Sequence, residues 1–252
     1  MEQYKKDFID FIFDRGALKI CDGPFNGYYK LKSGRLSPIF FNAGGLCFGS
    51  DLVRLGLAYA SVITKFYKNE DYDLIFGPSY KGITLAAAAS CALFTNFKFD
   101  KLFSYDRKEA KTHGESSKSG TAFNQKDFIV GAPITPFAKI LLVDDVLTTG
   151  ATKIDTINLL NKCAENIKFQ GLIITIDREE TLSDNSKLSA KEEFEKQTSI
   201  KVHSIVTMSE IISHLYSTKK INQKQFEILI QYQLKYGNKW SIWNGPCQYL
   251  KV

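Results

Sequence analysis

The sequence predicts an α/β fold in which a mainly parallel sheet is flanked by helices. Short apolar runs alternate along the chain with segments of helical periodicity, and this alternation is typical of parallel strands joined by helices. The alternation stops between residues 106 and 138, where charged residues, Gly, Ser and Thr predominate. A loop of that length inside a compact domain usually serves a function or is partly disordered. We therefore expect one domain, over residues 1–252, that carries a long mobile loop.

The first expected element is an amphipathic helix near the N-terminus, because Tyr4, Phe8, Phe11 and Ile12 recur at helical spacing. A loop rich in Gly, Pro and Asn follows at residues 21–28. Asp51 is expected to cap a second helix. The buried face of that helix should consist of residues that lie three or four apart: Leu52, Leu55, Tyr59, Val62 and Phe66.

The expected strands are short runs of apolar residues at positions 74–76, 102–105, 140–143, 172–176 and 202–206. Helices are expected between some of them, at residues 82–94, which are rich in Ala, and at residues 151–164. Residues 238–252 form a tail with two Trp residues and no predicted element.

Composition excludes several classes of protein. The chain has 252 residues, 44% of them hydrophobic and 24% charged, which is ordinary for a globular protein. Its net charge of +6 comes from scattered basic residues, and such a balance fits a phosphorylated small molecule as well as it fits nucleic acid. The five Cys residues form no CxxC pair, which argues against a disulfide framework or a zinc site. The sequence shows neither a secretory leader nor a membrane span, so we expect a cytoplasmic protein.

The strongest candidate site is the segment KILLVDDVLTTGAT at residues 139–152. An apolar strand runs into Asp144 and Asp145, a Thr/Gly turn follows, and then a helix begins. Ligands bind at the carboxyl ends of strands in open α/β sheets, and hydroxyls with backbone N–H groups at a helix N-terminus form an anion site. A sugar phosphate fits this layout, with its phosphate at the turn and its hydroxyls on the two carboxylates.

This segment has two other interpretations. The pattern alone also fits an acidic strand end followed by a polar helix cap. A Walker B strand would need a Walker A partner, GxxxxGK[ST]. The nearest candidate, GPSYKGIT at residues 77–84, lacks Lys at the seventh position, which excludes a P-loop hydrolase on this motif.

Residues 143–152 resemble the signature with which type I phosphoribosyltransferases bind 5-phosphoribosyl 1-pyrophosphate (PRPP). The resemblance implies the fold of that family, with an N-terminal hood region over residues 1–50 and a mobile catalytic loop, for which residues 106–138 are correctly placed. It also implies that the whole signature contacts PRPP, through Asp144, Asp145, Val146, Leu147, Thr148, Thr149, Gly150, Ala151 and Thr152.

Further segments resemble the orotate phosphoribosyltransferases. Residues 31–44 resemble their orotate-binding segment, residues 76–82 their pyrophosphate loop, and residues 105–115 the start of their mobile loop. Arg178 follows a strand where the family supplies an arginine for orotate. Each motif alone also fits a structural role, but their order and spacing from residue 4 to residue 237 favour this family.

The resemblance implies a role for each matching residue. Lys32, Tyr80, Lys81, Arg107, Lys108, Lys111 and His113 would contact PRPP, and Phe40, Phe41, Thr148 and Arg178 would contact orotate. Lys111, His113 and Asp145 would be the catalytic residues. The implied reaction transfers the 5-phosphoribosyl group of PRPP to orotate in pyrimidine biosynthesis, giving orotidine 5′-monophosphate and pyrophosphate.

The resemblance also implies a cofactor and partners. Mg²⁺ would bind mainly through PRPP and pyrophosphate, with no dedicated metal site on the protein. The family is homodimeric, with the mobile loop shared across the interface, and a separate orotidylate decarboxylase is compatible as a partner. No nucleic-acid or membrane partner is expected.

Two rival functions predict different sequence features. A phosphoribosyltransferase for purines or uracil would keep residues 144–152 but would not need residues 31–44 or Arg178. A regulator that senses PRPP should carry a DNA-binding helix pair, and residues 1–30 show none; it would also be free to lose the cations between Arg107 and His113. Departures from compact bacterial members are the longer loop at residues 21–28, extra residues around 118–137 and the tail.

Overall fold

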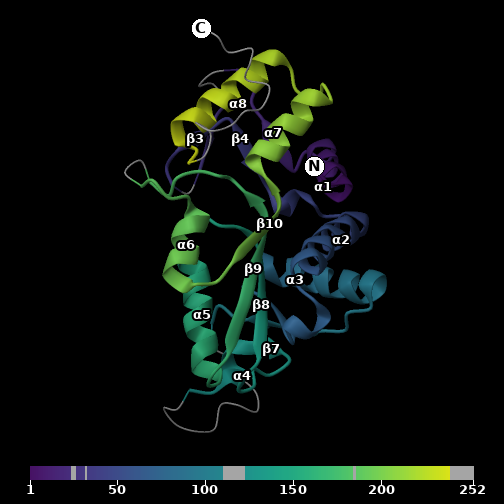
Figure 1. Ribbon diagram of the computed structural model, residues 1–252, viewed down its shortest axis with the longest axis vertical. Helices are drawn as coiled ribbons and strands as arrows, with labels where there is room; N and C mark the ends of the chain where they lie inside the picture. The colour runs from purple at the N-terminus through teal and green to yellow at the C-terminus, as the bar shows by residue number, and fades with distance from the viewer. Residues whose placement is uncertain (24–26, 32, 110–122, 184–185, 239–252) are drawn as a thin grey trace.

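A six-stranded sheet runs through the molecule in the order β10–β9–β8–β5–β6–β7 (Figure 1). This computed structural model describes residues 1–23, 27–31, 33–109, 123–183 and 186–238. The parallel strands are β5 (Leu74–Gly77), β6 (Leu102–Asp106), β8 (Lys139–Val146), β9 (Lys168–Asp177) and β10 (Val202–Thr207). Each of them contains one of the predicted apolar runs, so the prediction of a mainly parallel sheet is confirmed.

Helices cover both faces of this sheet (Figure 1). One face carries α2 (Gly49–Phe66) and α3 (Lys81–Ala92), and the other carries α5 (Ala151–Cys163) and α6 (Ala190–Thr198). Alternate residues of β8 face opposite cores: Leu141 and Val143 pack with the first pair of helices, and Ile140 and Leu142 with the second. Alternation is expected for a strand that is buried on both sides.

Two expectations about α2 are wrong. The helix begins at Gly49, with Phe48 at its N-cap, and Asp51 lies inside its first turn, where its carboxylate accepts a hydrogen bond from Phe48 N at 3.2 Å. Asp51 is therefore the third-residue partner of a cap and not the cap itself. Leu52 and Phe66 are exposed by 38% and 46%, because the buried face is centred on Leu55, Tyr59, Val62 and Ile63.

The polar interval at residues 106–138 is not loop throughout. Its second half forms α4 (Gln125–Phe128) and β7 (Ile129–Gly131), which pairs antiparallel with β6. Residues 110–122, the centre of the predicted mobile loop, lie outside the described residues. After α3, the chain continues through a π-helical turn, η3 (Leu93–Phe97), so the helix predicted to end at residue 94 is interrupted two residues earlier.

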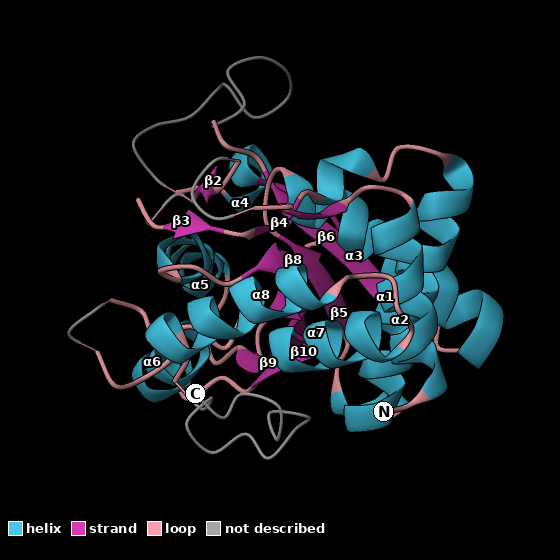
Figure 2. Cartoon of the chain, turned by 90° about the horizontal axis from the view of Figure 1, so that it is seen from above, coloured by secondary structure: helices cyan, strands magenta, loops and turns pink. Residues whose placement is uncertain are grey.

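The hood region expected at residues 1–50 packs with two C-terminal helices, and we call the whole assembly the hood. From the N-terminal part come α1 (Gln3–Asp14) and two antiparallel pairs, β1 (Leu18–Ile20) with β4 (Ile39–Phe41) and β2 (Tyr29–Lys30) with β3 (Leu36–Ser37). From the C-terminal part come α7 (Met208–Ser217) and α8 (Gln223–Tyr236), which lie over one end of the sheet in Figure 2. Short 3₁₀ turns, η1 (Ala43–Gly45) and η2 (Asn69–Asp71), complete the described elements.

An ion pair and a histidine–carboxylate contact join α1 to α7 within the hood. Lys5 Nζ lies 2.6 Å from Glu210 Oε1, and His214 Nε2 lies 3.0 Å from Asp10 Oδ1. The predicted amphipathic helix is confirmed as α1, with Phe8, Ile9, Phe11 and Ile12 buried. In the part of the chain that the structure describes, no helix combines the length and apolar character needed to cross a membrane.

Candidate active site

A cavity of about 950 Å³ lies where the carboxyl ends of β8 and β9 face the hood. Residues from well-separated parts of the chain line it, which brings together most of the predicted site. Those predicted from the sequence are Phe40, Phe41, Tyr80, Lys81, Lys108, Asp144, Asp145, Val146, Leu147, Thr148, Thr149, Thr152 and Arg178.

The turn between β8 and α5 forms one end of this cavity. Gly150 occupies the N-cap of α5 with φ +77°, a left-handed conformation that favours glycine. A Cβ there would also lie 3.1 Å from the ring of Phe194. The hydroxyl of Thr149 accepts a hydrogen bond from Ala151 N at 3.4 Å. The turn thus presents hydroxyls and the positive end of a helix to the cavity, as an anion site requires.

Each of the two adjacent carboxylates is paired with a lysine. Asp145 Oδ2 lies 2.7 Å from Lys81 Nζ, and Asp144 Oδ2 lies 2.5 Å from Lys153 Nζ. Burial raises the pKa of Asp144, while the ammonium of Lys153 opposes that rise. The hydroxyl of Tyr59 donates to Asp144 O at 2.7 Å, so the strand end is fixed from α2 as well as from α5.

Two glycines that flank the turn between β5 and α3 allow close packing, of Gly77 against Gly82 and of Gly82 against β8. A Cβ on Gly77 would lie 2.1 Å from Gly82 O, and a Cβ on Gly82 would lie 3.0 Å from Val143 O. Asp106 Oδ1 accepts a hydrogen bond from Ser79 N at 2.7 Å. This packing carries Tyr80, which is 71% exposed, and Lys81 to the rim of the cavity.

The part of the cavity lined by the hood and the end of β9 carries aromatic rings and an arginine. Phe40 stacks on Tyr29 with ring centroids 5.3 Å apart. Arg178 Nη2 donates to Glu180 Oε1 at 2.5 Å and to Ser37 Oγ at 3.1 Å. The Nε of Arg178 is buried and has no hydrogen-bond partner, so the guanidinium keeps donor capacity for a ligand.

Some predicted residues stand apart from the cavity. Gly150 and Ala151 belong to the turn between β8 and α5, which we call the phosphate turn after its predicted ligand, but they do not line the cavity. Arg107 does not line it either, and its backbone N–H donates to Phe128 O at 2.7 Å. Lys32, Lys111 and His113 lie outside the described residues, so their roles remain predictions.

The structure adds residues that the motifs did not predict. Lys153 lines the cavity from the first turn of α5, and Glu180 and Arg35 lie beside Arg178. Lys153 is the residue after the recognised signature, and Glu180 lies two positions after Arg178. This proximity was the only signal in the sequence, because only the fold shows that the two side chains are buried.

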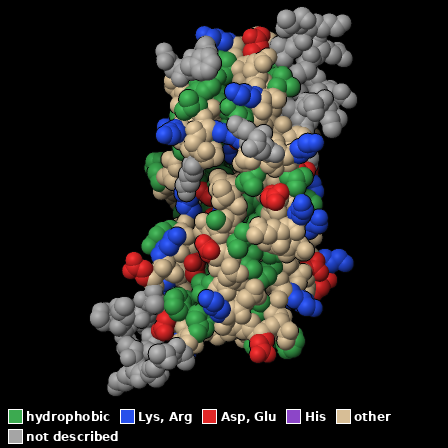
Figure 3. All heavy atoms as spheres, turned by 90° about the vertical axis from the view of Figure 1, so that its left-hand side faces the viewer, with side chains coloured by type: hydrophobic (Ala, Val, Ile, Leu, Met, Phe, Trp, Pro, Cys, Tyr) green, Lys and Arg blue, Asp and Glu red, His purple; other side chains and the backbone are tan. Residues whose placement is uncertain are grey.

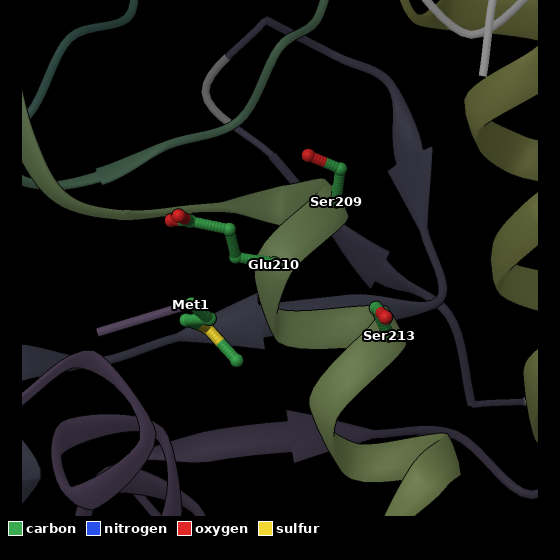
Figure 4. Close-up of a pocket in the computed structure, with 4 residues that line it drawn as sticks. All are labelled: Met1, Ser209, Glu210 and Ser213. Carbon is green, nitrogen blue, oxygen red and sulfur yellow. The ribbon is translucent and has the colours of Figure 1, made fainter. Parts of the chain in front are cut away.

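The described residues contain no group of three or more His, Cys, Asp or Glu side chains that could hold a metal ion. A smaller hollow of about 190 Å³ lies at the start of α7 and is lined by Met1, Ser209, Glu210 and Ser213 (Figure 4). Its one carboxylate, Glu210, already pairs with Lys5 and accepts a hydrogen bond from Thr207 N. That hollow therefore offers no second centre of chemistry.

Comparisons with known proteins agree with this geometry. Residues 55–203 match the model of the phosphoribosyl transferase domain. An orotate phosphoribosyltransferase of Haemophilus ducreyi is 38% identical over 94% of this chain and 100% of its own length, and one of Pseudomonas putida is 37% identical over the same shares. The crystal structure of the orotate phosphoribosyltransferase of Francisella tularensis superposes with a TM-score of 0.72 at 33% identity, covering 92% of this chain and 99% of that one.

The sheet order, the Asp144–Asp145 strand end and the phosphate turn thus define a type I phosphoribosyltransferase. Within that class the match extends through the hood and over nearly the whole chain. The chain belongs to the orotate phosphoribosyltransferase family.

Proposed function

We infer that this protein transfers the 5-phosphoribosyl group of PRPP to orotate, giving orotidine 5′-monophosphate and pyrophosphate in pyrimidine biosynthesis. The observation that carries this conclusion is that one cavity holds both a phosphate turn, at Thr148 and Thr149, and an arginine with a buried unpaired donor, Arg178. A phosphorylated sugar and a planar carboxylate that react with each other need those two features in one site.

PRPP would lie along the carboxyl ends of the central strands. Its 5′-phosphate would rest on residues 147–152, its ribose hydroxyls on Asp144 and Asp145, and its pyrophosphate near Lys81 and Lys108. The distance of 2.7 Å between Lys81 and Asp145 supports this placement, because the same lysine can turn from the carboxylate to a phosphate. Its side chain is 58% exposed and is therefore free to move.

Orotate would occupy the end of the cavity under the hood. Its ring would lie against Phe40 and Phe41, and its carboxylate would meet the guanidinium of Arg178. Arginine suits this role because its planar donors match the two oxygens of a carboxylate. Ser37 and Glu180 support that placement, since both accept hydrogen bonds from Nη2 and hold the guanidinium still.

The reaction forms a bond from N1 of orotate to C1 of the ribose as the bond from C1 to pyrophosphate breaks, and the proton that N1 loses leaves with the pyrophosphate. Positive charge develops on the ribose, where Asp144 and Asp145 offset it, and negative charge develops on pyrophosphate, where Lys81 and Lys108 offset it. The predicted loop cations Arg107, Lys111 and His113 would add to the second group. Closure of the loop would also exclude water, which competes with orotate for C1.

Mg²⁺ fits this site as a companion of the substrate. The ion would bind mainly through PRPP and pyrophosphate, because Mg²⁺ keeps much of its water and binds phosphate oxygens well. When bound, it would neutralise charge on the leaving pyrophosphate.

We further propose that the protein works as a cytoplasmic homodimer. Phe48, Val53 and Leu57 are exposed by 60%, 70% and 41%, and such an apolar face at the start of α2 supports contact with a second copy of the chain. On the face shown in Figure 3, basic and acidic side chains are interspersed, which gives nucleic acid no basic patch there. A separate orotidylate decarboxylase stays a compatible partner.

One assay tests the proposed activity. The protein is incubated with PRPP, Mg²⁺ and, in separate reactions, orotate, uracil, adenine or hypoxanthine, and consumption of each base is followed. We expect turnover of orotate alone. Turnover of another base without loss of orotate would contradict the proposal, and no turnover of any base would favour a protein that senses PRPP.

A further inference from the structure

A buried lysine lies beneath the phosphate turn. Lys153 is the third residue of α5 and is only 7% exposed. Its ammonium lies 2.5 Å from Asp144 Oδ2 and donates to Val146 O at 2.9 Å. Lysine is almost never buried without a specific partner. The proposed reaction gives Lys153 no role, so its burial beside Asp144 points to another function.

The two aspartates of the site differ in how firmly their lysines hold them. Lys81, the partner of Asp145, has a side chain that is 58% exposed, whereas that of Lys153, the partner of Asp144, is 9% exposed. An exposed lysine leaves its partner at little cost. A buried one cannot leave without stranding two charges away from water.

Asp144 is also satisfied on its other oxygen. Its Oδ1 accepts a hydrogen bond from Asp145 N at 2.9 Å, so both carboxylate oxygens already have partners within the protein. Asp145 uses Oδ1 for Val146 N at 2.7 Å, and its Oδ2 for Lys81 alone. Departure of Lys81 would therefore leave Oδ2 of Asp145 open to a substrate hydroxyl.

We propose that Lys153 is a positioning residue that holds Asp144 as the fixed carboxylate of the ribose site, whereas Asp145 becomes the mobile one when Lys81 turns to the pyrophosphate. This inference rests on the proposed function, because it assigns unequal roles to two residues of the same PRPP site. Asp144 fixes the end of β8, and Asp145 supplies the mobile carboxylate contact.

The charged groups around Asp144 support this division. It faces Lys153 from α5 and Asp145 from its own strand, and Tyr59 contacts its carbonyl from α2. Burial and Asp145 raise the pKa of Asp144, and Lys153 is the main group that lowers it. Without Lys153 the carboxyl would take up a proton at a higher pH.

The test is a cycle of four proteins: wild type, Lys153→Met, Asp144→Asn and the double variant. KM and kcat for PRPP and for orotate are measured, with the pH profile of kcat/KM for PRPP. We expect Lys153→Met to lower kcat/KM for PRPP on the order of tenfold to a hundredfold, since a misplaced group next to the reacting centre has effects of that size. Its acidic limb should move to higher pH.

The double variant separates positioning from direct contact with substrate. If Lys153 acts through Asp144, adding Lys153→Met to Asp144→Asn should cost little more, because the stranded charge is gone. Losses that multiply in the double variant would overturn the proposal and indicate that the ammonium contacts PRPP itself. An acidic limb that stays in place in Lys153→Met would overturn it too.

Two further proteins complete the experiment. Lys153→Arg keeps the charge and should keep the wild-type acidic limb, which tests the proposal even if Lys153→Met fails to fold; a shifted limb in Lys153→Arg would contradict it. Lys162→Met removes an exposed lysine from the last turn of the same helix and should match wild type. Calorimetric titration with PRPP reads the same cycle without turnover, so a wild type that binds PRPP but does not consume orotate would refute the proposed function alone.

Discussion

Arg178 shows how much of a binding site one residue needs from its neighbours. Its guanidinium lies just after β9 and is held there by two neighbours, because Glu180 and Ser37 both accept hydrogen bonds from Nη2. Arg35 lies 3.8 Å from the same Glu180 carboxylate and donates to Thr181 O at 2.7 Å. One buried carboxylate therefore stands between two arginines, one from the hood and one from the sheet.

Replacing Glu180 with Gln should weaken orotate binding selectively. The amide keeps the volume of the side chain but removes the charge that separates Arg35 from Arg178, so their mutual repulsion should displace the guanidinium. We expect KM for orotate to rise about tenfold, as for the loss of a charge-assisted contact, with KM for PRPP little changed. Steady-state kinetics with each substrate varied in turn measure this.

The matched control is Glu165→Gln, which removes an exposed carboxylate between α5 and β9. It should leave both KM values at their wild-type level. A lower KM for orotate in Glu180→Gln would show instead that Glu180 competes with the substrate for Arg178.

At the scale of residues, the sequence could predict contacts inside motifs and little beyond them. Phe40, Lys81 and Arg178 were predicted because they belong to recognisable runs, and all three line the cavity. Lys153 and Glu180 were not, because a charged residue on a helix or after a strand is usually solvated. Their significance depends on burial, which only the packing of α5, β9 and the hood determines.

Among the elements, the turn that begins α5 depends on one glycine. Gly150→Ala should weaken PRPP binding, because a left-handed conformation costs a non-glycine residue about 1–2 kcal/mol and the new Cβ would press on Phe194 at 3.1 Å. We expect a lower melting temperature and a KM for PRPP raised about tenfold, corresponding to about 1.4 kcal/mol. Thermal unfolding and initial rates check both effects.

Gly49→Ala is the appropriate control for that substitution. Gly49 is the first residue of α2, its added Cβ would meet nothing within 4 Å, and its φ is not positive. The control should unfold at or slightly above the wild-type temperature. Equal behaviour of the two variants would mean that the phosphate turn tolerates a side chain.

A stack between α2 and β10 gives the fold a dependence on pH. His203 lies on Phe66 with ring centroids 3.8 Å apart, and burial chiefly lowers its pKa, with smaller contributions from Lys191 and Lys201. As the pH falls through the ordinary histidine value of about 6.5, the unfolded chain takes up a proton that the folded chain refuses. The stability that the fold has with a neutral His203 is therefore fully present above the ordinary histidine pKa. It is lost as the pH falls towards the lower pKa of the folded state.

His203→Phe should abolish this part of the pH dependence. We expect the variant to gain stability relative to wild type between about pH 8 and about pH 5.5, measured as the change in the urea midpoint at each pH. A difference between the two proteins that stays constant over this range would show that His203 does not titrate with folding.

Elements were predictable where they are long and contact the sheet. All five apolar runs became parallel strands, because continuous burial on both faces leaves a clear signal. The strands of the hood have two or three residues each, too few for a period to be seen. No helix was predicted after residue 206, although α7 and α8 follow, and α4 and β7 were missed because they interrupt a polar interval.

At the scale of the whole molecule, the proposed orotate site joins the hood to the common core. The phosphate turn and its aspartates belong to the matched domain at residues 55–203, whereas Phe40 and Phe41 lie before it. The hood is fastened to the core through Arg35 and Glu180 and to itself through the contacts between α1 and α7. Under the proposed function, specificity for the base therefore depends on how the hood assembles on the core.

The family resemblance implies that each site of the proposed homodimer uses the mobile loop of the partner subunit. Two inactive variants can test it: Lys111→Ala, which should lower kcat far more than it weakens PRPP binding, and Arg178→Ala, which should lose orotate. In a mixed dimer with shared loops, one site combines an intact Arg178 with the partner subunit's intact loop, while the other site carries both defects.

Mixing the two inactive proteins under conditions that exchange subunits should therefore restore about a quarter of wild-type activity, because half of the randomly formed dimers are mixed and each has one intact site of two. Light scattering before and after exchange establishes that dimers are present. Each variant exchanged with itself should stay inactive. If every loop serves its own subunit, no mixed dimer contains an intact site and the mixture stays inactive too, which would confine the catalytic loop to its own chain.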